Sequence, residues 1–102
     1  MIARVWHGWT SRDNADAYES FLHTTMFPSM HALDGFRGVD LLRRDDGDEV
    51  AFITISRFES LDAVRRFAGD DYETAVIEPE ARALLSRCDE RSAHYELVFE
   101  NA

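Results

Sequence analysis

The sequence is short of cysteine and proline and has no lysine: its 102 residues include one cysteine, two prolines and no long apolar run. The lone Cys88 cannot form an internal disulfide, and it excludes a zinc site built from cysteines. No apolar stretch is long enough for a membrane-spanning helix, and the first residues lack the basic segment and apolar core of a secretory signal. We therefore expect a cytoplasmic protein with no membrane partner.

Positive charge is also scarce, because eleven arginines stand against twenty acidic residues and give a formal net charge of −9. A nucleic-acid-binding surface would need clustered positive charge to overcome that field. The two basic doublets, Arg43-Arg44 and Arg65-Arg66, lie close to aspartates and are interpreted as solvated surface. The sequence therefore predicts no nucleic-acid partner.

The overall composition is that of an ordinary globular domain, with 45% hydrophobic and 30% charged residues. A chain of this length can bury one core but cannot enclose a deep cleft between two domains. No internal repeat, low-complexity tract or linker divides the sequence. Residues 1–102 are therefore expected to form a single domain.

Large rings gather near the amino terminus, in the segment RVWHGWT at residues 4–10. Side chains of a strand alternate between its faces, so a strand here places Arg4 and Trp6 on one face and His7 and Trp9 on the other. A surface strand would have one wet face, whereas here both faces carry a large ring. We expect helices to cover one ring and a partner sheet to cover the other, and the sequence leaves open which is which.

The apolar pattern divides the rest of the chain into alternating elements. Strands are predicted at about residues 2–9, 33–44, 49–58 and 92–100. Helices are predicted at residues 14–27, 61–68 and 80–88, with residues 70–79 as a connector.

Local signals mark several of the boundaries. Pro28 is expected to end or kink the first helix, because proline lacks the backbone N–H that an interior helical position needs. Asp46-Gly47 predicts a hairpin turn between the second and third strands. Ser60 is suited to cap the second helix, and Pro79 suits the first turn of the third.

This order predicts an α+β fold with a ferredoxin-like, four-stranded antiparallel sheet and helices on one face. The first and third strands look apolar on both sides, so the second face of the sheet would be a large bare apolar surface. The simplest partner for such a face is a second copy of the chain. We therefore expect a homodimer in which two sheets pack face to face.

Over nearly its whole length the chain resembles the antibiotic biosynthesis monooxygenase family of dimeric α/β-barrel proteins. The resemblance is carried by LDGFRG entering the second strand, by ITISRFESLDAVRRF from the third strand into a helix, and by DDYETAV. It implies ferredoxin-like monomers that pair into a barrel, each with a cavity between sheet and helices. Several members are cofactor-independent oxygenases of phenols or quinols, and some degrade haem.

The resemblance can be carried over position by position. Haem-degrading members have an asparagine on the first strand, a tryptophan in the second helix and a histidine about ten residues later. Arg4, Phe67 and Val76 or Ile77 stand at those places here, so none of the three matches. Members that oxidise aromatic polyketides have a tryptophan and a tyrosine near the second helix; Tyr72 matches the tyrosine, and Phe67 replaces the tryptophan.

Oxygenation of a phenol without a cofactor needs an apolar cavity, a base or acceptor that favours the phenolate, and a cation or donor for the developing oxyanion. Arg4 can supply the cation, and a surface or dimer salt bridge is its alternative role. Tyr72 and His7 are the other catalytic candidates, with a satisfied buried histidine as the alternative for His7. The substrate-binding candidates, each with a core or interface role as alternative, are Trp6, Tyr18, Phe67 and His94.

Metal chemistry is not predicted. His23 and His31 have no carboxylate or histidine partner at metal-binding spacing, and no phosphate loop or dinucleotide fingerprint occurs. Asp40, Thr54 and Ser56 alternate with apolar neighbours on predicted strands, and the sequence leaves open whether they face the cavity or the dimer.

The leading hypothesis is a cofactor-independent monooxygenase that acts on a small aromatic, phenolic or quinol-type molecule in a cavity between sheet and helices. The first alternative is a non-catalytic hydrophobic-ligand-binding or stress-response barrel that uses the same cavity. The second is a haem-binding protein with His7, His23 or His94 as the iron ligand.

Overall fold

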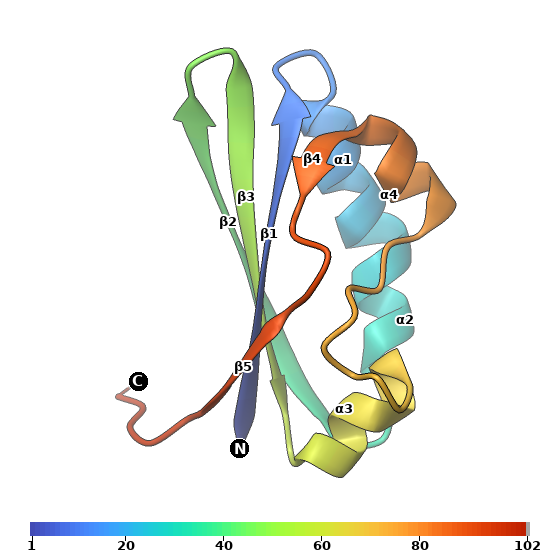
Figure 1. The fold of residues 1–102 in the computed structure, drawn as a ribbon, viewed down its shortest axis with the longest axis vertical. Coiled ribbons are helices and arrows are strands. Elements are labelled where there is room, and N and C mark those ends of the chain that lie inside the picture. The colour runs from blue at the N-terminus through green and yellow to red at the C-terminus, as the bar shows by residue number, and fades with distance from the viewer. Residues whose placement is uncertain (102) are drawn as a thin grey trace.

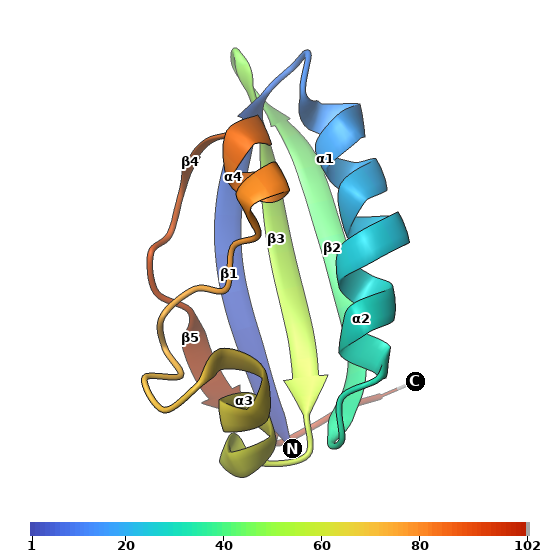
Figure 2. The same ribbon diagram turned by 90° about the vertical axis from the view of Figure 1, so that its right-hand side faces the viewer.

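The computed structural model describes residues 1–101. The elements in chain order are β1 Ile2–Ser11, α1 Ala15–Phe21, the π-helical turn η1 Leu22–Met26, α2 Phe27–His31, β2 Phe36–Asp46, β3 Glu49–Phe58, α3 Leu61–Ala68, α4 Pro79–Leu84, β4 Leu85–Cys88 and β5 Ala93–Glu96. Figures 1 and 2 show the helices as one layer on a single face of the sheet. The predicted α+β fold is therefore confirmed.

The sheet is antiparallel throughout and has the order β2-β3-β1, with β4 and β5 both pairing with the far edge of β1. It has five strands where the sequence predicted four, because residues 85–88, which were predicted as helix, form the additional strand β4. β4 pairs with residues 8–10 of β1 and β5 with residues 2–5, and residues 89–92 interrupt the two pairings. The long strand predicted at 92–100 is therefore wrong beyond Glu96.

The helix predicted at residues 80–88 is also too long. α4 ends at Leu84, and Leu85 has extended backbone angles of φ −78° and ψ 137°. Leu85 then pairs with Thr10 of β1 and packs against the core, so its segment gains sheet hydrogen bonds in place of helical ones. A four-residue strand is too short for alternation to distinguish it from the end of a helix.

Pro28 does not end the first helix, because α1, η1 and α2 follow one another without a break up to His31. In η1 the N–H of Phe27 donates to the carbonyl of Leu22, five residues back, and Pro28 follows within the first turn of α2. Proline lacks an N–H to donate, and it is accommodated here directly after the π-helical turn, where the regular α-helical hydrogen-bond pattern is interrupted. The continuation brings Met30, which is buried, against the core.

The β2–β3 hairpin turns one residue later than predicted. Asp46 pairs with Glu49, which leaves Gly47 and Asp48 as the loop. Gly47 has φ +66°, whereas no residue other than glycine has positive φ within residues 1–101. This is the pattern of a type II′ turn, which follows the twist of the flanking strands.

Ser60 caps α3 as predicted, with its Oγ accepting from the N–H of Ala63.

The register between β1 and β3 settles how the rings of β1 divide. Arg4 lies opposite Ser56 and Trp6 opposite Thr54, and all four face the helices and line one cavity. Val5, His7 and Trp9 lie on the other face, which no helix covers. Trp6 is therefore the ring under the helices, and Trp9 is the ring that the sequence assigned to a partner.

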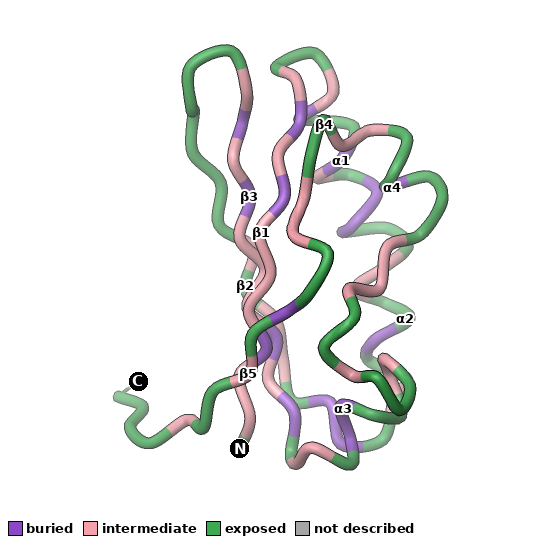
Figure 3. The backbone as a smooth tube through the Cα atoms, viewed as in Figure 1, coloured by how far each residue is buried: buried purple, intermediate pink, exposed green. Residues whose placement is uncertain are grey.

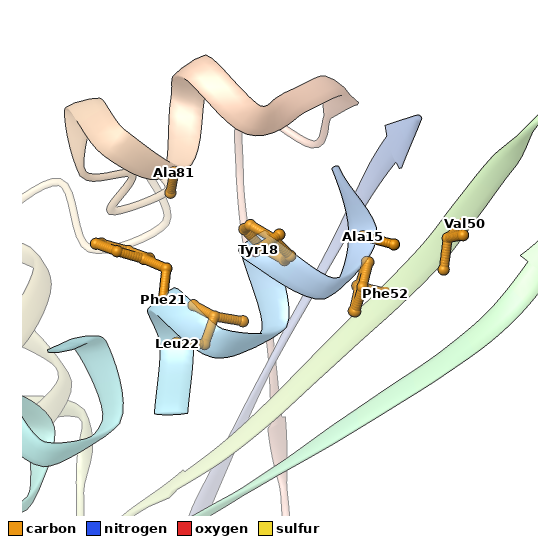
Figure 4. Packing of buried hydrophobic residues seen from close by; sticks show 7 residues of the cluster. All are labelled: Ala15, Tyr18, Phe21, Leu22, Val50, Phe52 and Ala81. Atoms are coloured by element: carbon orange, nitrogen blue, oxygen red, sulfur yellow. The ribbon is translucent and has the colours of Figure 1, made fainter. Parts of the chain in front are cut away.

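The core lies between the sheet and the helices. Figure 4 shows one part of it, where Tyr18, Phe21 and Leu22 of the first helix pack towards Phe52 of β3 and Ala81 of α4. The rings of Tyr18 and Phe52 meet edge to face at 4.9 Å between centroids. A second cluster, around Met30, Phe36, Phe58, Ala63 and Val64, joins α2 and α3 to the other end of the sheet.

The sheet face opposite the helices, called the open face below, is apolar near its centre. Leu42 pairs with Ile53 and Val5 with Ile55 on this face, and Leu42 is 46% exposed. The tail after β5 points away from the rest of the chain (Figures 1 and 3), and its Val98 is 85% exposed. None of the helices within residues 1–101 is both long and apolar enough to span a membrane.

Gly8 lets the Trp6 indole lie flat along β1. A Cβ at position 8 would come within 2.5 Å of Cη2 of Trp6, so any other residue would push the ring away. The indole position matters for the cavity, because its Nε1–H donates to the carbonyl of Asp89 at 2.8 Å. A glycine is therefore needed at position 8 to leave room for the Trp6 ring, which lines the cavity, and not to form a turn.

We predict that Gly8→Ala lowers the free energy of unfolding by about 1–3 kcal/mol, because the added methyl overpacks against the Trp6 ring. Chemical denaturation measures the loss, and fluorescence in a Trp9→Phe background reports the displaced Trp6. In a Trp6→Phe background, where Cη2 is absent, the cost should shrink. An equal cost in both backgrounds would show that the ring is not what Gly8 accommodates.

Candidate functional site

A cavity of about 50 Å³ lies between the sheet and the helices. β1 and β3 form its floor, the helix from α1 to α2 forms one wall, and Phe67 of α3 with residues 76–78 forms the other. Figure 2 shows the connector of residues 69–78, which joins α3 to α4, crossing the helix side of β1. The lining is mainly apolar, with Arg4 as its only cation within residues 1–101.

Arg4 is 4% exposed and holds the connector to the first strand. Its Nη1 donates to the carbonyl of Tyr72 at 2.5 Å, and its Nη2 donates to the carbonyl of Thr74 at 3.1 Å. Its Cζ also lies 5.5 Å from the centroid of the Phe67 ring. The guanidinium therefore has a structural role. The only structural role that the sequence predicted for Arg4 was a salt bridge.

Arg4 is a buried cation without a carboxylate partner in the part of the chain that the structure describes. Burial lowers the pKa of Arg4 to about 10, so the group remains charged at neutral pH. The alternative role of a surface salt bridge is therefore wrong, because the contacts of Arg4 are neutral and inside the protein.

His94 completes the contacts of Arg4. Its Nε2 lies 2.9 Å from Nη1 of Arg4, and because a guanidinium only donates, Nε2 must accept. The imidazole is then neutral with its proton on Nδ1, which is enclosed and has no hydrogen-bond partner within residues 1–101. Burial and then the charge of Arg4 lower the pKa of His94, in agreement with the neutral form.

Tyr72 and His94 support the site from outside it. Their rings stack at 5.1 Å between centroids, and neither side chain is part of the cavity lining. Tyr72, predicted as a catalytic residue, does not line the cavity: its ring stacks on His94, and its backbone carbonyl accepts from Arg4. His94, predicted to bind the substrate, does not line the cavity either; it contacts Arg4.

His7 is wrong as a catalytic candidate for this cavity. It lies on the open face, where its Nδ1 is 3.0 Å from a carboxylate oxygen of Asp89 and its ring stacks with Trp9. The reason is the period of two along a strand, which sends His7 to the face opposite Trp6. Its side chain is 42% exposed in the single chain and lies on the face where the sequence predicted a partner sheet, so the alternative of a histidine buried against that partner stays a prediction.

The other predicted substrate-binding residues do meet in the cavity. Trp6, Tyr18 and Phe67 line it together with Arg4. Tyr18 is 2% exposed, and burial is the first cause, with Cys88 the second, that raises the pKa of its hydroxyl. The phenol is therefore a neutral hydroxyl group at the cavity and not a base.

Three hydroxyl residues of the lining were missed or left open by the sequence. Thr54 and Ser56 face the cavity from β3, whereas Asp40 points to the open face and pairs with Arg57 at 2.8 Å. Ser92 enters the lining from the segment between β4 and β5. The register of the first strand against the third places Ser56 opposite Arg4, so knowledge of that register would have predicted Ser56. Ser92 lies outside the strands, where no alternation predicts the direction of its side chain.

The chain matches no protein-family model and no curated protein. Its fold does match solved structures, among them a Bacillus cereus protein provisionally designated an antibiotic biosynthesis monooxygenase. That protein is 12% identical, with 100% of this chain and 95% of the other covered and a TM-score of 0.66.

Two further similar structures belong to proteins with a named activity. SnoaB from Streptomyces nogalater, a cofactor-independent oxygenase, is 20% identical over 99% of this chain and 95% of its own, with a TM-score of 0.60. The heme-degrader MhuD from Mycobacterium tuberculosis is 18% identical over the whole of both chains, with a TM-score of 0.62. The family resemblance is therefore confirmed at the level of the fold, and identities this low leave the reaction open.

The haem alternative needs a histidine as the iron ligand. No histidine is among the lining residues of this cavity within residues 1–101, so the haem alternative through His7 or His94 has no ligand there. His23 does not line this cavity; it lines a separate, more open pocket of about 410 Å³ between the first helix and β2. Residues 1–101 also contain no group of three or more His, Cys, Asp or Glu residues that could hold a metal ion.

We predict that Arg4→Met releases the connector, because the carbonyls of Tyr72 and Thr74 lose their donor. Amide hydrogen exchange should rise over residues 72–77 by at least about tenfold, which corresponds to about 1.4 kcal/mol of local stability. Arg57→Met on the open face is the matched control and should leave that exchange unchanged. Protection that persists in Arg4→Met would show that other contacts hold the connector.

Proposed function

We propose that this protein is a homodimeric, cofactor-independent monooxygenase that oxidises a small aromatic, phenolic or quinol-type molecule in the cavity beside Arg4. The observation that carries the proposal is a buried guanidinium that has no carboxylate partner within residues 1–101 and is set in a mainly apolar cavity. The fold shared with a cofactor-independent oxygenase supports the same assignment.

The reaction balances without a redox cofactor. For a phenol with a free para position, phenol and O₂ give a para-quinone and water. A C–O bond forms at the ring carbon, the O–O bond breaks, and one oxygen atom stays as the new carbonyl. The other oxygen leaves as water with the ring hydrogen and the phenolic hydrogen. The four electrons that reduce O₂ come from the substrate.

The role of Arg4 is to stabilise negative charge on the substrate. A phenolate gives up electrons to O₂ more readily than a phenol does, and a buried cation lowers the pKa of a bound phenol. No histidine lines the cavity within the described residues, and Glu78, the one carboxylate of the lining there, is exposed, so the phenolic proton passes to solvent on the side of Glu78. The surrounding apolar walls strengthen the attraction by excluding water.

The other residues position the ring and the cation. Trp6 and Phe67 provide flat apolar walls, and the Tyr18 hydroxyl can donate to a substrate oxygen. Tyr72 and His94 act as positioning residues, because each bonds the guanidinium and neither lines the cavity.

The cavity must enlarge to hold a ring. Its volume of about 50 Å³ is well below the roughly 150 Å³ of a cavity that binds benzene. Met26 and Met30 line it, and methionine side chains repack easily. The connector above it has no helix and one isolated bridge, Thr74 to Arg91, so it is the wall least fixed by regular structure.

We predict O₂ uptake above the uncatalysed rate when the metal-free protein meets a panel of quinols and hydroxylated polycyclic aromatics. Arg4→Met should lower kcat by about 100-fold or more, as expected for loss of a charge-stabilising group. His7→Asn, on the open face, is the matched control and should keep the wild-type rate. An O₂ electrode measures all three proteins.

Two results would refute this assignment. Uptake that never exceeds the uncatalysed rate, together with saturable binding of the same molecules, would identify a non-catalytic ligand-binding barrel. Uptake that Arg4→Met leaves unchanged would remove the cation from the mechanism.

The dimer is the second part of the proposal. The open face carries a continuous apolar centre, with Val5, Ile53 and Ile55 in adjacent positions and Leu42 beside them. A copy of the chain that packs its own open face there would cover these residues on both partners. Val98 and Phe99 of the tail, 85% and 80% exposed, would gain cover from the same partner.

We predict that sedimentation analysis finds a dimer at micromolar concentration. Ile53→Glu should weaken it by at least about 100-fold in Kd, because a carboxylate would be buried at the centre of the interface. Thr24→Glu on the exposed side of the helix layer is the control and should leave the dimer intact. A wild-type monomer at that concentration would contradict the pairing of open faces.

A further inference from the structure

One end of the cavity gathers three buried polar side chains. Arg4, Ser56 and Ser92 are 4%, 3% and 5% exposed, and all three line the cavity. They come from neighbouring strands: Arg4 pairs directly with Ser56 of β3, and on its other side Arg4 pairs with His94 of β5, two residues after Ser92. This end is therefore a compact group of side chains on the sheet floor.

The polar atoms at this end have hydrogen-bonding capacity that the protein does not use. Within residues 1–101, neither the Ser56 nor the Ser92 hydroxyl has a hydrogen-bond partner, and the Nε–H and one Nη2–H of Arg4 have none either. Nδ1 of His94 is the one fully enclosed side-chain polar atom without a partner in residues 1–101, so these other groups are not sealed off. The accessible space beside them is the cavity.

The charge at this end is uncompensated. The three bonded partners of Arg4 are two backbone carbonyls and a neutral imidazole. Arginines elsewhere in the described chain, such as Arg43, Arg57 and Arg91, pair with carboxylates. Burying a cation without a counter-charge is costly, and a ligand that brings a negative charge offsets that cost.

Glu78 limits where such a charge can sit. It is the only carboxylate in the lining within residues 1–101, it is exposed, and no ion pair joins it to Arg4. An anionic group is therefore repelled from the rim near Glu78 and attracted to the floor at Arg4. The walls between, which include Leu22, Phe67 and Ile77, are apolar.

We infer that the ligand of this cavity is an ionised aromatic acid, with a carboxylate or an acidic phenolate seated on Arg4, Ser56 and Ser92 and an apolar ring against the walls. The inference rests on the proposed function, since it takes the same cavity as the substrate site, and it narrows the substrate to molecules that are anionic before they bind. Adjacent N–H groups of a guanidinium can donate to both oxygens of a carboxylate, and the two serine hydroxyls add donors beside them.

The test compares two probes of similar shape and different charge, 1-naphthoate and its neutral amide 1-naphthamide, by calorimetric titration at pH 7. The carboxylate should bind the wild-type protein at least about tenfold more tightly. Ser56→Ala and Ser92→Ala, which remove hydroxyls without protein partners, should each weaken naphthoate several-fold and leave naphthamide unchanged. Arg4→Met should abolish the preference, and Arg57→Met on the open face should retain it.

Equal affinity for the two probes would overturn the inference, as would a preference for naphthoate that survives in the Ser56→Ala, Ser92→Ala double variant. Failure of both probes to bind at millimolar concentration would overturn it as well. Binding is measured without turnover, so the outcome is separable from the oxygenase proposal. Preference for the acid with no O₂ uptake by any substrate would refute only the reaction, and uptake of neutral quinols with equal binding of both probes would refute only the acid site.

Discussion

The arrangement of the cavity depends on one buried guanidinium. Arg4 joins the first strand to the carbonyls of residues 72 and 74 and to the ring of His94, so a single side chain holds β1, the connector and β5 together. A lysine could not replace it, because three partners in different directions require the planar fork of arginine. The same group supplies the only positive charge of the cavity lining in residues 1–101. Arg4 thus both supports the connector and supplies the charge on which the proposed function depends.

Much of the fold could be predicted from the sequence, because long elements carry repeated signals. β1, β3 and α3 each have several turns or alternations of apolar residues, and Ser60 adds a cap. The errors fall where a tertiary contact outweighs a local signal. Leu85 joins the sheet because β1 offers an unpaired edge, and the first helix passes Pro28 because a π-helical turn precedes it. Neither effect is visible in the spacing of apolar residues alone.

The candidate site was predictable in part for the same reason. Arg4 and Trp6 share a face in any strand, so their neighbourhood followed from alternation, but the side on which they lie needed the register with β3. His7 was assigned to the cavity because the sequence could not fix that side. Tyr72 was placed by analogy of position, whereas the path of the connector decides that its carbonyl, and not its hydroxyl, meets Arg4. Ser92 lies in an irregular segment, where no period exists to predict a direction.

The pairing of β1 with the last strands affects how the protein folds. The contacts of Arg4 span 68 to 90 positions along the chain, and β1 reaches its second neighbour only through residues 85–96. Contacts between distant positions form slowly, because a long loop must close before they contribute. During synthesis the hairpin of β2 and β3 and the first helix can associate early, while one edge of β1 stays unpaired until residue 96 has left the ribosome. The cavity is therefore complete only once residues 72–96 have joined β1.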